Sequence, residues 1–111
     1  MNQKKYIYNV TVNFEEDIHH DWLLWIKEHI PQVLSTGKFE KATLTKVLVD
    51  NKIEGHTYSI QYRSYSREAL DAYYKEDADK LRTDGFKKFA DKMLAFRTEL
   101  EIIDEYTVSF K

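Results

Sequence analysis

Residues 5–37 read KYIYNVTVNFEEDIHHDWLLWIKEHIPQVLSTG, and the fold prediction depends on the change of hydrophobic period within them. Over residues 5–14 apolar and polar side chains alternate, which predicts a strand with one buried face. Over roughly residues 16–35 the apolar residues recur at helical spacing, after acidic residues that favour the start of a helix. Pro31 is expected to kink or restart this helix, and Gly37 to end it.

The rest of the chain repeats these two patterns in an order that indicates the fold class. Alternation predicts strands at residues 39–49, 56–64 and about 94–103. In the first of these the alternation is imperfect, which a bulge or burial of both faces would explain. Helical spacing between the last two predicts a helix capped by Ser66 and broken near Asp77. The order strand, helix, two strands, helix, strand predicts an α+β, ferredoxin-like βαββαβ fold with an antiparallel sheet and a broken second helix.

Composition bounds the remaining possibilities. With 111 residues the chain suits one domain, residues 1–111, in which the tail 104–111 is a candidate extra edge strand. The net charge is −2 and no basic stripe is present, so we expect no nucleic-acid partner. Cysteine is absent, which excludes disulfides and thiol chemistry. No apolar run approaches the ~18 residues of a membrane span, so we expect a cytoplasmic protein without membrane attachment.

Alternation also assigns side chains to the two faces of the sheet. The face expected to meet the helices is apolar: Tyr8, Val10, Tyr58, Ile60, Tyr62, Phe96 and Leu100. The other face is mostly polar: Asn9, Thr11, Asn13, Ser59, Gln61, Arg63, Arg97 and Glu99. Either this face is solvated, as in many antiparallel sheets, or two subunits join there. We favour the homodimer, with Asn9, Gln61, Arg63 and Arg97 as candidates for the dimer face.

His29 is the most informative single residue, because it lies on the apolar arc of the first helix. An imidazole there is either a core histidine bonded to a tyrosine or a backbone carbonyl, or an acid/base group in a pocket. The expected ligand-binding residues are Trp22, Trp25, His29, Tyr58 and Tyr73. Asp77 also falls on an apolar arc, either as a helix N-cap or as a second catalytic candidate facing the same cavity as His29.

The sequence gives little support for a metal site or a cofactor site. Glu16, His19 and His20 are close in sequence, but adjacent histidines point about 100° apart on a helix and make a poor pair of ligands. No other three-ligand constellation is apparent, so we expect no metal. Glycine-rich phosphate loops and nucleophile elbows are absent from the sequence, and we expect no cofactor.

The spacing of Trp22, His29, Pro31 and Gly37 resembles that of dimeric α/β-barrel proteins, among them antibiotic-biosynthesis monooxygenase-like and EthD-like proteins, several of which carry a similar His-x-Pro. The whole chain resembles a small bacterial family catalogued only as a domain of unknown function. The matching stretches are residues 8–13, 22–39, 58–62 and 89–98. The resemblance implies the fold and a dimeric α/β barrel, and it implies no activity.

Two functional hypotheses follow from the sequence. The first is a non-enzymatic dimer that binds a small apolar or aromatic molecule, or a protein partner. The alternative is a cofactor-independent enzyme of the monooxygenase or isomerase type with His29 as acid/base. A pocket of about 300 Å3 or more that His29 reaches would favour the enzyme, whereas a filled core around His29 would favour a structural role.

Overall fold

The computed structural model describes residues 4–48 and 55–108. Nine elements follow one another: β1 (Tyr6–Phe14), the 3-10 helix η1 (Glu16–Ile18), α1 (His19–Leu34), β2 (Phe39–Lys46), β3 (His56–Ser64), α2 (Arg67–Glu76), α3 (Ala78–Phe89), the 3-10 helix η2 (Ala90–Lys92) and β4 (Met93–Glu101). The predicted hairpin turn between β2 and β3 lies mostly outside the described residues. The order of elements confirms the predicted α+β plan, with the second helix divided into α2 and α3.

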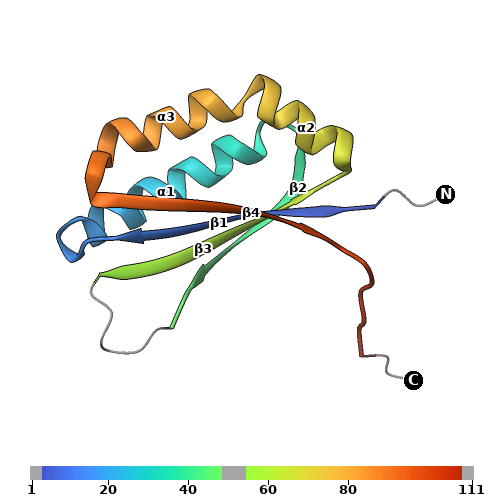
Figure 1. The fold of residues 1–111 in the computed structure, drawn as a ribbon, viewed down its shortest axis with the longest axis horizontal. Helices are drawn as coiled ribbons and strands as arrows, with labels where there is room; N and C mark the ends of the chain where they lie inside the picture. Colours follow the sequence, from blue (N-terminus) through green and yellow to red (C-terminus); the bar gives the residue numbers. More distant parts are fainter. Residues whose placement is uncertain (1–3, 49–54, 109–111) are drawn as a thin grey trace.

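The strands form one antiparallel sheet in the order β2-β3-β1-β4, which is the ferredoxin-like arrangement. All three α-helices cover the same face of this sheet, and the C-terminal tail turns away on the other side (Figure 1). Residues 102–108 form no strand, so the described part of the tail lacks the expected extra edge strand. Within the described residues, no helix is both long and apolar enough to cross a membrane.

Helix α1 packs on the sheet through a stripe of apolar side chains. Trp22, Ile26 and Val33 are buried at helical spacing, and Trp22 is fully enclosed. The helix continues through Pro31 to Leu34, contrary to the restart expected there. Proline costs one hydrogen bond, but the carbonyl of Pro31 still accepts the amide of Ser35 at 2.9 Å, which holds the last turn.

The helical segment after β3 has a clear start and a clear break. The Ser66 side chain accepts the amide of Ala69 at 3.1 Å and caps α2, as expected. Asp77 then leaves helical geometry with φ −126° and ψ −31°, and α3 begins at Ala78, which is buried. The chain changes direction at this break, so that α3 also packs an apolar face against the core.

The register of β4 corrects the predicted faces of the sheet. Thr11 pairs with Phe96 and Val10 with Arg97, so Phe96 points away from the helices and Arg97 points towards them. Glu99 likewise pairs with Tyr8 and lies on the helix-facing side, so the faces expected for Phe96, Leu100, Arg97 and Glu99 were wrong. Because side chains alternate with period two, the face assigned to a whole strand reverses if the pairing register is misjudged by one residue. Apolar content alone did not reveal which side of this edge strand faces the helices.

Candidate functional site

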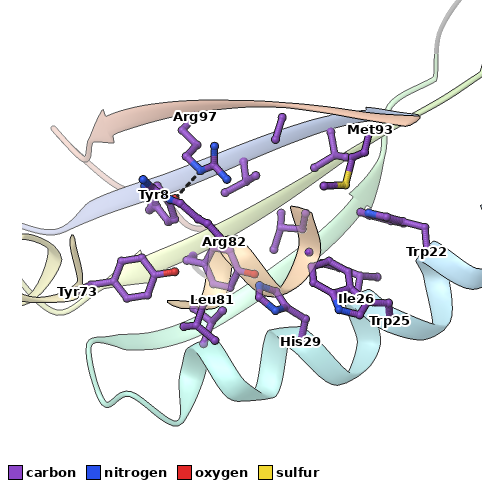
Figure 2. A pocket seen from close by; sticks show the side chains of 17 residues that line it. Tyr8, Trp22, Trp25, Ile26, His29, Tyr73, Leu81, Arg82, Met93 and Arg97 are labelled. Atoms are coloured by element: carbon purple, nitrogen blue, oxygen red, sulfur yellow. Dashed lines mark hydrogen bonds between the residues drawn. The ribbon is translucent and has the colours of Figure 1, made fainter. Parts of the chain in front are cut away.

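A cavity of about 60 Å3 lies between the helices and the sheet. Trp22, Trp25 and His29 of α1 and Tyr73 of α2 all line it (Figure 2). The fold thus places four of the five expected ligand-binding residues around one space, while their role stays a prediction. The volume suffices for a few waters or a small chemical group, and it lies well below the roughly 300–1,000 Å3 of sites that enclose a drug-sized ligand.

His29 is half-buried and packs flat on Trp25, with ring centroids 4.3 Å apart and ring planes 20° from parallel. Among the described residues no side chain or backbone group forms a hydrogen bond with its ring. Burial lowers the pKa of His29, and the nearby carboxylate of Asp84 opposes this only in part. Burial thus favours the neutral form of His29, and within the described residues the ring lacks the tyrosine or carbonyl partner of the simpler interpretation.

The Trp25 ring is held between α1 and α3 by a very close contact. A Cβ atom added at Gly85 of α3 would lie 2.7 Å from Cη2 of Trp25, a distance that real structures essentially never show. On the neighbouring side Phe89 meets Trp25 edge-on, with ring centroids 5.6 Å apart. The absence of a side chain at Gly85 thus sets the position of the indole, and with it the position of His29.

Two arginines reach this cavity and were not among the ligand-binding residues expected from the sequence. Arg82 of α3 donates from Nη2 to the Tyr8 hydroxyl at 2.9 Å, and Arg97 of β4 donates from Nε to the same oxygen at 3.0 Å (Figure 2). Arg97 was expected at the dimer face and instead faces the helices. A signal for Arg82 existed, because it lies between the buried Leu81 and Gly85 at positions that share one face of α3.

The two arginines mark the boundary between the cavity and a groove at the open edge of the sheet. The groove has a volume of about 430 Å3 and shares Arg82, Arg97 and two further lining residues with the cavity. Phe86 and Leu94 line its outer part, where their side chains are largely exposed. Because β4 is an edge strand, no further strand of the described regions closes this side of the pocket.

Two expected site residues lie elsewhere. Asp77 does not line the cavity, and its carboxylate instead accepts from Lys38 Nζ at 3.3 Å. It stands at the N-cap position of α3, as the first sequence interpretation expected, although its side chain forms no capping bond. Tyr58 is also outside the cavity lining, and its hydroxyl bonds Nε2 of His19 at 2.8 Å. Helix α2 ends before Asp77, so the helical arc extrapolated to that residue did not apply.

Glu16, His19 and His56 come together at the far end of the core, with potential ligand atoms within 4.8 Å of one another. The sequence argument against a metal missed this group, because His56 is distant in sequence. The two imidazoles are stacked, however, with centroids 3.7 Å apart and planes 23° from parallel. Lone pairs of imidazole nitrogens lie in the ring plane, so stacked rings do not direct them to one ion, and His56 Nε2 already contacts Glu16.

The other expected dimer-face residues lie on the outer face of the sheet. Asn9 pairs with Gln61 across β1 and β3, and Asn9 accepts a hydrogen bond from Ser59 at 2.6 Å. Arg63 is bound by Glu105 of the tail through two contacts of 2.6 and 2.7 Å. The polar outer face is thus tied together by its own hydrogen bonds, and the tail is fastened to it.

Comparison with solved structures supports this fold. Two dimeric ferredoxin-like proteins from an uncultured marine organism superpose with TM-scores of 0.75 and 0.62, at 14% and 18% identity, over 94% and 97% of this chain and 100% and 96% of theirs. A protein provisionally assigned as an antibiotic biosynthesis monooxygenase from Bacillus cereus gives a TM-score of 0.63 at 12% identity, over 95% of this chain and 99% of its own. At such identities the likeness shows the fold alone.

No curated protein matches the chain in sequence. A family model described as a domain of unknown function, DUF4286, matches residues 5–103, which is most of the chain and nearly the whole described region. This confirms the resemblance to a family of that kind. The chain belongs to the DUF4286 family.

Proposed function

We propose that the protein is a homodimer that binds a small apolar or aromatic molecule in the pocket around Trp25 and His29. The observation that carries this proposal is a half-buried imidazole that has no hydrogen-bond partner among the described residues, is stacked on an indole and faces a cavity. A polar group in such a place gains a partner when a ligand or water occupies the cavity. The cytoplasmic location expected from the sequence is part of this proposal.

Support for the dimer comes from the outer face of the sheet. Leu94, Phe96 and Leu100 form an apolar row on β4 with 60%, 62% and 43% of their surfaces exposed. In the tail, Ile103 and Tyr106 are more exposed still. Exposed apolar groups gathered on one side of a small domain are typical of an interface. A second copy is the occupant we propose, since two solved proteins of the same fold are described as dimeric.

A cofactor-independent enzyme is the second candidate, and one observation favours it. Burial keeps His29 neutral and therefore able to accept a proton at neutral pH, as a general base must. The small size of the cavity, about 60 Å3, argues against a substrate that is fully enclosed. The reaction would require the groove between α3 and β4 to hold most of the substrate.

Native mass spectrometry of protein purified from its own host tests the ligand proposal. A dimer with a reproducible extra mass is the expected result, and the extra mass should be lost in Trp25→Leu, which removes the stacking surface. A dimer without extra mass, whose tryptophan fluorescence is unchanged by small aromatic compounds, would contradict the ligand proposal.

Light scattering at micromolar concentration tests the dimer separately. The wild type should have twice the monomer mass, and Phe96→Asp should give monomers because it places a charge within the apolar row. Leu24→Asp is the matched control: Leu24 is 56% exposed but lies on α1, which covers the opposite face of the sheet. A monomeric wild type, or equal dissociation by both substitutions, would contradict the assigned interface.

A further inference from the structure

We propose that Arg82 and Arg97 bind the carboxylate of a small organic acid at the boundary between the cavity and the groove. This inference rests on the proposed ligand-binding pocket and names the chemical class of its ligand. Three observations support it: the two arginines converge, neither has an acidic partner in residues 4–48 and 55–108, and the surroundings on both sides are apolar.

The two guanidinium groups approach from opposite sides of the pocket. Arg82 comes from α3 and Arg97 from β4, and both donate to the Tyr8 hydroxyl oxygen, at 2.9 and 3.0 Å. Two donors that close to one oxygen are at most about 6 Å from each other, a separation at which like charges repel. A carboxylate between them would remove the repulsion and offer two oxygen acceptors to two planar donor groups.

No carboxylate of the described residues neutralises this pair. Glu99 shares the helix-facing side of β4 with Arg97, but it is already bound by Arg67 at 2.8 Å and by the Tyr74 hydroxyl at 2.5 Å. Neither Arg82 nor Arg97 forms an ion pair within the described regions. Nε of Arg82 is buried and forms no hydrogen bond with any of the described residues, so the hydrogen-bonding capacity of this guanidinium group is not used up within them.

The surroundings indicate an organic acid rather than a bare anion. On the inner side the cavity is walled by Trp25, Ile26 and other apolar side chains, and its volume of about 60 Å3 admits only a small group. On the outer side the groove of about 430 Å3 runs between Phe86 and Leu94. A ligand with its carboxylate at the arginines can place an aromatic or short aliphatic body against these walls, where burial of apolar surface adds to binding.

Sequence-distant elements build this site, and each of the three side chains has a separate role. Tyr8, which is 2% exposed, positions both guanidinium groups through its hydroxyl. Arg82 lines the cavity and is half-buried, and Arg97, which is exposed, lines both the cavity and the groove. We expect Arg82 to contribute more to binding than Arg97, because charge-assisted hydrogen bonds are stronger away from water.

The test compares benzoate with benzamide, which has nearly the same shape and no charge, by isothermal titration calorimetry on the full-length protein at pH 7.5 and low salt. We expect benzoate to bind at least tenfold more tightly than benzamide. Arg82→Gln should abolish this preference and Arg97→Gln should reduce it. Lys80→Gln is the control, because it removes the same charge from an exposed position of α3 and should leave the preference intact.

Circular dichroism and the oligomeric mass establish that each variant is folded. Arg82→Lys keeps the charge without the planar fork, and an intermediate preference for benzoate is expected for it. If Arg82→Gln does not fold, Arg82→Lys and Arg97→Gln carry the test. Inorganic phosphate is titrated in a separate experiment. If phosphate binds as tightly as benzoate, the assignment to an organic acid is overturned.

The outcomes separate this inference from the proposed function. Equal binding of benzoate and benzamide to the wild type, or a preference for benzoate that survives both Arg82→Gln and Arg97→Gln, would overturn the carboxylate site and leave an apolar pocket in place. Failure of both compounds to bind would overturn the carboxylate site as stated. The ligand proposal would fail with it only if the native protein also carried no extra mass.

Discussion

Substitution of Gly85 by alanine is the sharpest test of how the pocket is held together. The new Cβ would lie 2.7 Å from Cη2 and 3.0 Å from Cζ2 of the Trp25 ring. The contact can be relieved only if the indole turns or α3 moves away from α1. Since His29 stacks on the same indole, movement of Trp25 also changes the shape of the cavity.

The magnitude follows from two opposing effects. Alanine is better than glycine within a helix by about 1 kcal/mol, and Gly85 lies inside α3 with helical neighbours on both sides. Overpacking of a filled interior costs about 1–3 kcal/mol. The net effect of Gly85→Ala should therefore range from near zero to a loss of about 2 kcal/mol in the free energy of unfolding.

A double-mutant cycle separates these two effects. In a Trp25→Phe background the clashing atoms of the indole are gone, so the same Gly85→Ala change should become stabilising by up to about 1 kcal/mol. Urea denaturation followed by circular dichroism measures the free energy of unfolding in all four proteins. An equal effect of Gly85→Ala in both backgrounds would refute the reasoning, because it would show that Trp25 does not set the cost.

Three further predictions concern single positions. As the pH is lowered from 7.5 to 5.5, the free energy of unfolding should decrease, because the unfolded chain takes up a proton at the ordinary histidine pKa of 6.5 and folded His29, whose pKa is lowered, takes up less. His29→Asn should reduce this slope in urea titrations at several pH values, and an unchanged slope would contradict the lowered pKa. Ser66→Ala should cost about 1 kcal/mol through loss of the α2 cap, and an unchanged urea midpoint would contradict the capping role. Gly55→Ala should lower the melting temperature, since Gly55 has φ +85° and a Cβ there would lie 2.4 Å from the Phe14 carbonyl oxygen; a melting temperature equal to that of wild type would argue against the described turn geometry.

Periodicity was sufficient for the architecture of this protein. The prediction for strand 56–64 matches β3, and the strand expected at 5–14 matches β1 with one residue less at its start. The break near Asp77 was also found, because acidic residues in mid-helix signal a new helix start. Such features depend on neighbours within a few positions in the chain, and those neighbours are visible in the sequence itself.

Sequence periodicity predicted only some of the residues that line the pocket. Trp22, Trp25 and His29 share one helix, so their common face followed from 100° per residue, and Tyr73 was included as an aromatic residue on the apolar side of the next helix. The helical arc failed at Asp77, because the chain leaves α2 there and takes a new direction.

Sequence alone determined the class of fold, the order of its elements and the histidine on the apolar face of α1. The tertiary structure alone decided which side of β4 faces the helices, and therefore that Arg97 joins Arg82 at Tyr8 while Phe96 faces outwards. The physical reason is that strand register is set by pairing between segments far apart in the chain, and a shift of one residue reverses every side chain. Local periodicity carries no information about that pairing, so both the arginine pair and the apolar outer row emerged only from the folded sheet.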